Sequence, residues 1–200
     1  MWEARAIWLL RIAIVASAAV FVVQGELILA ACCGLSLAVA IVPTYIVSAA
    51  RLSTWIDLEL VGLWLLATHV VLGIALDLYS RVPWFDKILH LEASGVVGLV
   101  VFVSVDRVID QRVKGRWLLD GVLIVIGTIG VGAMWEIAEF TADHAFGWWT
   151  QGSPQLDPLP DTMWDLVCDG VGAALAALAG PSVVELRRRR RATAPTNTRA

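Results

Sequence analysis

Long apolar segments separated by short polar links run through most of the 200-residue chain. Each segment is close to the roughly 20 apolar residues that an α-helix needs to cross a bilayer core. The apolar runs are continuous and do not alternate, which favours helices over strands. The predicted spans are residues 6–23, 27–50, 60–76, 87–105, 117–140 and 162–184. The pattern therefore predicts an all-α polytopic membrane protein, a bundle of six transmembrane helices.

Composition agrees with this interpretation. Hydrophobic residues make up 58% of the chain and the mean hydropathy is +0.75, which is more apolar than an ordinary soluble domain. Because the links between most spans are short, residues 1–186 are predicted to form one six-helix transmembrane domain. The polar, arginine-rich residues 187–200 are predicted to be a disordered cytoplasmic tail. The first span lacks a clear small-residue cleavage site, so we expect it to be retained.

Basic residues predict how the chain crosses the membrane, since Lys and Arg favour the cytoplasmic side. If both termini are cytoplasmic, every one of the 15 Lys and Arg except Arg81 and Lys87 lies on the inner side. The opposite orientation would reverse this asymmetry. Both termini are therefore predicted to be cytoplasmic. The five arginines at 187–191 follow the last span directly, which favours contact with anionic lipid headgroups over nucleic-acid binding.

Acidic residues gather at one end of the last three predicted spans, which is the outer end in this topology. Spacings of three and four residues place the members of each set on one helix face. Ionisable groups at membrane depth are costly and by default mark a functional site. The residues are Asp86 and His90 at the outer end of the fourth span, Glu136, Glu139 and Asp143 at that of the fifth, and Asp161, Asp165 and Asp169 at that of the sixth.

Simpler explanations exist for some of these acids. Asp86 and Asp161 stand where they could be helix N-caps. Asp143 lies at a helix C-terminus, where the helix dipole disfavours an anion. Few basic residues are nearby to offset so many carboxylates, so a bound cation or shared protons would complete the site. Carboxylates with an imidazole suit Mg²⁺, Mn²⁺, Ca²⁺ or Zn²⁺, and the spacing does not select among them.

The leading hypothesis is a metal-dependent enzyme or binding protein that acts on a phosphate-bearing lipid or envelope precursor at the outer leaflet. The predicted catalytic residues are His90, Asp86 and Lys87. His90 would be a ligand or general base, and Lys87 would meet the anion or extend to the membrane interface. The expected metal ligands are Glu136, Glu139, Asp161, Asp165 and Asp169. The alternatives are a cation or proton-coupled transporter and a non-catalytic envelope assembly protein. The sequence leaves the oligomeric state open.

Two further features bear on packing. His69 lies in the middle of the third span and is predicted to be a hydrogen-bonded packing residue, with a proton relay as the alternative. Six glycines in the last three spans are predicted to let helices approach closely. They are Gly95, Gly98, Gly127, Gly130, Gly170 and Gly172.

Three motifs carry a resemblance to a known family. They are PWFDKILH at 83–90, MWEIAEF at 134–140 and DTMWDLVCDGVG at 161–172. Together they resemble the YjdF family of bacterial inner-membrane proteins and, more distantly, the VanZ-like proteins. The resemblance implies a multi-pass helical bundle in the bacterial cytoplasmic membrane and makes the acids, His90 and Lys87 of these motifs its characteristic residues. It supplies no reaction, and a cell-envelope role follows only by analogy.

Overall fold

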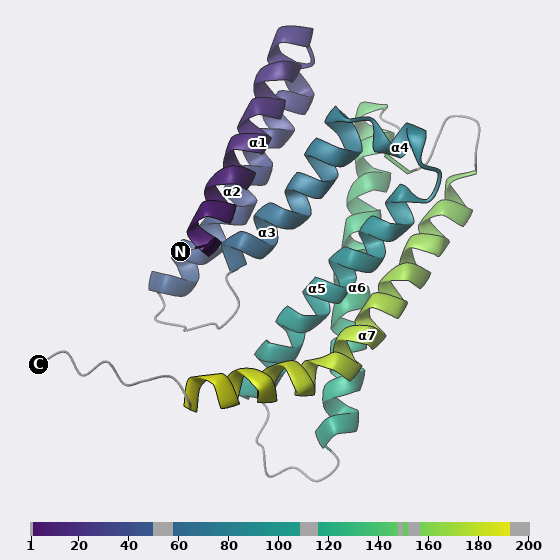
Figure 1. Cartoon of the computed structure of the whole chain (residues 1–200). Helices are drawn as coiled ribbons and strands as arrows, with labels where there is room; N and C mark the ends of the chain where they lie inside the picture. The colour runs from purple at the N-terminus through teal and green to yellow at the C-terminus, as the bar shows by residue number, and fades with distance from the viewer. Residues whose placement is uncertain (1, 50–57, 109–115, 148–149, 152–156, 193–200) are drawn as a thin grey trace, which may run out of the picture. The chain divides into compact units, whose positions relative to one another are not determined.

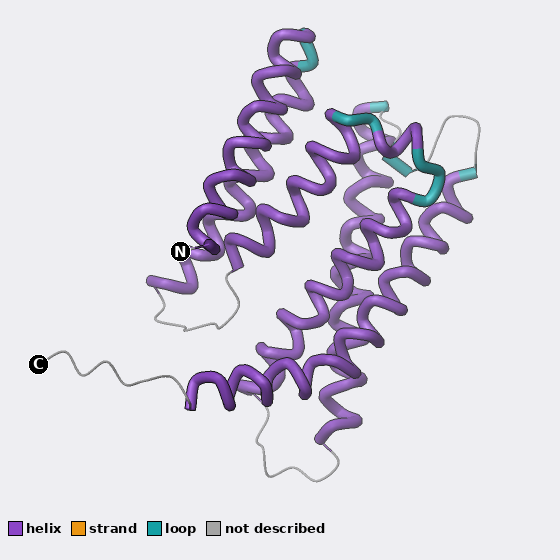
Figure 2. The backbone as a smooth tube through the Cα atoms, in the orientation of Figure 1, coloured by secondary structure: helices purple, strands orange, loops and turns teal. Residues whose placement is uncertain are grey.

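A computed structural model describes residues 2–49, 58–108, 116–147, 150–151 and 157–192, and every regular element in this part of the chain is helical (Figure 2). The all-α prediction is confirmed. The elements are α1 (Trp2–Gln24), α2 (Leu27–Ala49), α3 (Leu58–Ala67), the π-helix η1 (Thr68–Ala75), α4 (Leu78–Arg81), α5 (Phe85–Val108), α6 (Arg116–Phe146) and α7 (Pro158–Ala192) (Figure 1).

Three described segments are long and apolar enough to cross a membrane: Glu3–Gln24, Trp117–Phe146 and Pro158–Gly180. Shorter apolar stretches occupy Leu27–Ala38 and Glu59–Ala75. Helices that could span a membrane are thus present, while the six-span count and the cytoplasmic termini stay predictions. Helix α7 runs to Ala192 and so includes residues 187–192, where the sequence predicts a disordered tail. Residues 193–200 lie outside the described part.

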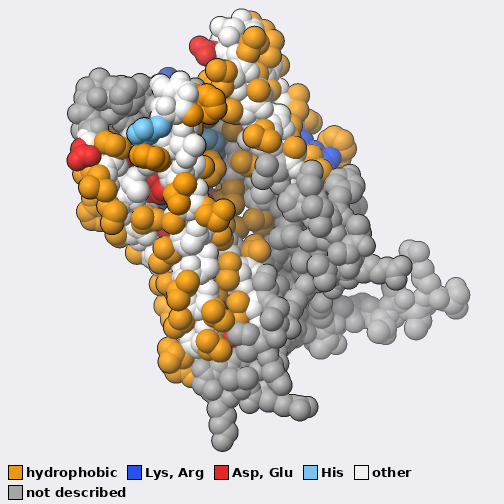
Figure 3. Space-filling view, turned by 180° about the vertical axis from the view of Figure 1, so that it is seen from behind, with side chains coloured by type: hydrophobic (Ala, Val, Ile, Leu, Met, Phe, Trp, Pro, Cys, Tyr) orange, Lys and Arg blue, Asp and Glu red, His pale blue; other side chains and the backbone are white. Residues whose placement is uncertain are grey.

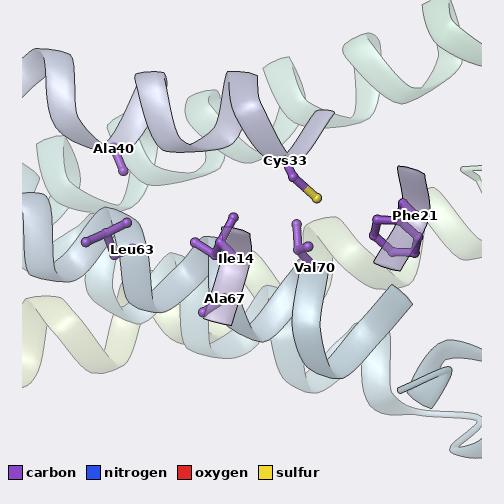
Figure 4. Packing of buried hydrophobic residues seen from close by; sticks show 7 residues of the cluster. All are labelled: Ile14, Phe21, Cys33, Ala40, Leu63, Ala67 and Val70. Carbon is purple, nitrogen blue, oxygen red and sulfur yellow. The ribbon is translucent and has the colours of Figure 1, made fainter. Parts of the chain in front are cut away.

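Internal contacts divide the chain into two compact units, Met1–Leu89 and His90–Ala200. The boundary falls inside α5, between Leu89 and His90. In the first unit α1, α2 and α3 pack against one another, and their buried residues include Ile14, Cys33 and Leu63 (Figure 4). Gly25 allows the tight turn from α1 to α2, because its φ of 84° belongs to the left-handed region that glycine adopts without strain.

Two polar contacts also join elements of the first unit. Arg11 of α1 forms an ion pair with Glu59 of α3, and its guanidinium lies 5.0 Å from the Trp8 ring centroid. In η1, His69 Nδ1 lies 2.6 Å from the Tyr79 hydroxyl oxygen. The prediction that His69 is a hydrogen-bonded residue is confirmed, and the relay alternative is not tested.

The second unit holds α6 packed along α7 (Figure 1) and the greater part of α5. A Cβ on Gly98 of α5 would lie 2.6 Å from Ala176 Cβ of α7, and one on Gly172 of α7 would lie 2.6 Å from the Leu91 carbonyl oxygen of α5. Close approach at these two glycines is confirmed. The prediction of close approach is wrong for Gly130, where an added Cβ would meet no described atom within 4 Å.

Apolar side chains cover the outside of the described helices. Ile126 of α6 is 64% exposed and Leu178 of α7 is 78% exposed, and hydrophobic side chains are spread over the described part of the face shown in Figure 3. Exposure on this scale would be a liability in water and is expected of surfaces that face lipid. Several polar groups of the second unit are buried instead, including Thr128, Glu136 and Asp165.

Candidate metal centre

Three helices of the second unit bring four ionisable side chains together. Helix α5 supplies His90, α6 supplies Glu136, and α7 supplies Asp165 and Asp169. All four are buried, with 2–8% of their surface exposed. Asp165 and Asp169 are four residues apart, so they lie one above the other on one face of α7. The predicted convergence of the polar stripes therefore exists for these four residues.

The two ring nitrogens of His90 face different carboxylates. Nδ1 lies 3.2 Å from Asp169 Oδ1, within hydrogen-bonding distance. Nε2 lies 3.6 Å from Glu136 Oε1 and 3.8 Å from Asp165 Oδ1, too far for hydrogen bonds. Ligands that hold one ion tetrahedrally at about 2.1 Å are separated by roughly 3.4 Å. The Glu136 Oε1 and Asp165 Oδ1 atoms are therefore each about one ligand–ligand separation from His90 Nε2.

Asp169 has a different relation to His90. A histidine that binds a metal through one nitrogen commonly donates its other N–H to a carboxylate, which fixes the tautomer and the ring orientation. The Asp169 contact at Nδ1 fits this role and would leave the Nε2 lone pair directed at Glu136 and Asp165. Gly132 of α6 makes room for the carboxylate, since a Cβ there would collide with Asp169 Oδ2.

Local packing of α5 holds His90 in this position. The Ser94 hydroxyl donates to the His90 carbonyl oxygen over 2.6 Å, and Ser94 is only 4% exposed. Gly172 removes a side chain that would strike Ser94 and the Leu91 carbonyl. The small residue on α7 thus allows α5 to come close enough for its imidazole to reach the acids.

Ionised carboxylates buried in this cluster require charge compensation. Glu136, Asp165 and Asp169 carry three negative charges when ionised, and His90 can supply at most one positive charge. Residues 117–186 contain no Lys or Arg. Removing carboxylates from water without compensation costs several kcal/mol per ion. A divalent cation, or protons shared among the acids, would meet this requirement.

Two predicted catalytic residues lie on the same helix, one turn before this cluster. Lys87 Nζ lies 3.0 Å from Asp86 Oδ2, so the two charges offset each other. Asp86 precedes His90 by four residues on α5, so the two lie on one face of this helix. Asp86 is inside the first turn of α5, which begins at Phe85.

Glu139 and Asp161 lie outside the buried part of the cluster. Glu139 is partly exposed, and its Oε1 accepts a hydrogen bond from Trp135 Nε1 over 2.9 Å. Asp161 is partly exposed in the first turn of α7. It is not the N-cap considered from the sequence, because the helix begins earlier and Asp157 Oδ1 accepts the Leu159 N–H over 3.0 Å.

The Asp143 carboxylate is hydrogen-bonded by residues that follow α6. Its carboxylate accepts hydrogen bonds from the Thr150 N–H (2.8 Å), the Thr150 hydroxyl (2.6 Å) and the Gln151 N–H (3.1 Å). Three donors explain how an anion is tolerated near a helix C-terminus. Gln151 is itself buried, at 9% exposure, and nothing in its sequence position signalled this. A single polar residue in a link looks like any solvated loop residue.

The fold and this cluster define a helical membrane protein with a buried carboxylate–imidazole site. The chain belongs to the family described as "Predicted membrane protein (DUF2238)", whose model matches residues 5–185. An uncharacterized protein of Thermotoga maritima is 32% identical over 107 residues, which cover 52% of this chain and 51% of the relative. The matched region thus spans about half the length of that relative. No solved structure matches, and the resemblance to YjdF and VanZ-like proteins stays a prediction.

Proposed function

We propose that the protein binds one divalent transition-metal cation through His90 Nε2, Glu136 and Asp165, with Asp169 positioning the imidazole. The observation that carries this proposal is the division of His90 between a hydrogen-bonded carboxylate at Nδ1 and two more distant carboxylates at Nε2. A mixed nitrogen and oxygen ligand set favours Zn²⁺ or Mn²⁺ over Ca²⁺ and Mg²⁺, which prefer oxygen alone.

Three protein ligands leave one tetrahedral position open, which is the arrangement of catalytic zinc sites and not of structural ones. A metal ion held there would polarise a phosphoryl oxygen and make a water molecule more acidic. We propose a phosphate-bearing lipid or envelope precursor as the substrate, at the outer leaflet of the cytoplasmic membrane. Asp86 would accept the proton from the attacking water, and Lys87 would contact the phosphate.

Cation transport is the second candidate, and one observation on α6 favours it. Asp120, Thr128 and Glu136 recur at intervals of eight residues and are all buried. Thr128 is only 1% exposed, and within the described part of the chain its hydroxyl oxygen has no hydrogen-bond partner. Buried polar groups along a membrane helix are typical of ion pathways.

Elemental analysis of the purified protein in lipid nanodiscs tests the cation site. We expect about one metal ion per chain, retained in Glu139→Gln and lost in Asp165→Asn while the helix content by circular dichroism stays unchanged. Full metal occupancy in a folded Asp165→Asn protein would overturn the proposed site. Release of phosphate from lipid phosphates would then support the enzyme, and metal uptake into proteoliposomes without phosphate release would support the transporter.

A further inference from the structure

The chain turns back along α6 after this helix ends. The turn starts at Gly147, whose φ of 69° is left-handed and whose N–H donates to the Asp143 carbonyl oxygen over 2.9 Å. The Thr150 hydroxyl oxygen then lies 3.2 Å from the Glu139 carbonyl oxygen. Gln151 Nε2 lies 3.5 Å from the Glu136 carbonyl oxygen, about one turn nearer the start of α6. Two successive residues thus approach successive turns of α6 and reach the turn that bears a proposed ligand.

Gln151 also joins α6 to α7. Its Nε2 donates to Thr162 Oγ1 of α7 over 2.9 Å. Thr162 precedes Asp165 by three residues, so it shares a helix face with this carboxylate and lies nearer the start of α7. The Gln151 amide therefore lies between the turn of α6 that bears Glu136 and the first turns of α7.

Asp143 holds the two residues in place, because its carboxylate accepts the three hydrogen bonds from Thr150 and Gln151 described above. The contact between Gln151 and Thr162 is different in kind. It is a single bond between neutral groups, which costs little to break compared with a charged one. The backbone of Thr150 and Gln151 is thus held by a charged acceptor. The Gln151 side chain, which lies between α6 and α7, is held by hydrogen bonds between neutral groups.

From this arrangement we propose that Gln151 is the gate through which a cation reaches the buried carboxylates. This inference rests on the proposed cation site and adds its route of entry. Rotation of the Gln151 side chain breaks its bonds to Thr162 Oγ1 and to the Glu136 carbonyl oxygen and opens the approach to the buried carboxylates, while the Asp143 anchor stays formed. The approach carries Glu139, Asp143 and Asp161, and no Lys or Arg occurs in residues 117–186. Such a surface attracts cations.

Thiol labelling tests the gate without any metal. In a protein whose native cysteines are replaced by alanine, Glu136→Cys is exposed to a small cationic methanethiosulfonate. We expect Gln151→Ala to raise the labelling rate about fivefold to tenfold, the effect of losing about one hydrogen bond. Thr141→Ala is the matched control at the same end of α6, because among the described residues its hydroxyl bonds the Ile137 carbonyl of its own helix, and it should leave the rate unchanged.

A second measurement uses the protein with Glu136 intact. Stopped-flow binding of Co²⁺ should show association and dissociation both accelerated by a similar factor in Gln151→Ala, with the Kd changed less than about threefold. Joining Gln151→Cys to Thr162→Cys by a disulfide should slow both rates, and reduction should restore them. Unchanged labelling in Gln151→Ala would overturn the gate. A faster dissociation alone would also overturn it, by making Gln151 a positioning residue. Absence of Co²⁺ binding to the native protein, with labelling still accelerated by Gln151→Ala, would refute the cation site and leave the access route standing.

Discussion

Gly132→Ala probes the candidate centre without changing any charge. A Cβ at this position would collide with Oδ2 of Asp169, and Asp169 Oδ1 is the group 3.2 Å from His90 Nδ1. Both Gly132 and Asp169 lie within long helices, so neither backbone can shift cheaply. The added methyl group is expected to turn the carboxylate away and leave the imidazole without its orienting partner.

The size of the effect follows from two terms. An added methyl group in a packed interior costs about 1–3 kcal/mol of stability, offset in part by the roughly 1 kcal/mol by which alanine is favoured over glycine in a helix. The protein should therefore stay folded. Loss of a carboxylate that orients a metal-bound histidine lowers metal affinity by about 10–100-fold. The metal affinity should thus fall far more than the stability of the fold.

Gly130→Ala is the matched control on the same helix, since a Cβ there meets nothing within 4 Å in the described part of the chain. Competition titration with a chromogenic chelator gives the metal affinity, and the thermal midpoint gives the stability. We expect weakened binding in Gly132→Ala and native binding, with equal or higher stability, in Gly130→Ala. Equal affinities in the two variants would refute the role assigned to Asp169.

Three further predictions address single contacts. Asp169→Asn should weaken metal binding about 10–100-fold without abolishing it, measured by the same titration, because Asp169 orients the ligand; complete loss would make it a ligand instead. Glu59→Gln should lower stability by about 3 kcal/mol by leaving Arg11 partly buried without its anion, and Arg11→Met in the same chain should restore most of it; chemical denaturation checks both. A hydrogen bond from Ser80 holds the pKa of Asp77 below its ordinary value. Asp77 therefore stabilises the fold above about pH 4 and loses this contribution as the pH falls through its lowered pKa. If the free energy of unfolding depends on pH in the same way in Asp77→Asn as in the native protein, this prediction is contradicted.

The sequence predicted most of the helices because each apolar run is long and continuous. It also predicted the meeting of His90, Glu136 and Asp165, since costly groups at equal depth can only hide by facing one another. It could not separate these residues from Glu139, because helical spacing defines a face to within a turn, whereas burial depends on how three helices are rotated against one another. The different roles proposed for Asp165, as a ligand, and for Asp169, as the residue that orients the imidazole, likewise depend on which ring nitrogen of His90 each carboxylate approaches.

Longer-range contacts were also beyond the sequence pattern. Asp143 looked like an anomaly at a helix C-terminus until the Thr150 and Gln151 donors were placed, seven and eight residues away. Gly132 belonged to a run of small residues in which Gly130 is open and Gly132 faces a carboxylate. The difference between the two glycines is a rotation about α6, which periodicity alone does not determine.

X-ray absorption spectroscopy of the Zn²⁺-loaded protein tests the central claim most directly. We expect one imidazole with oxygen ligands at about 2.0–2.2 Å, and loss of the imidazole scattering in His90→Ala. A metal environment that still contains an imidazole in His90→Ala, or one built from oxygen alone in the native protein, would contradict it.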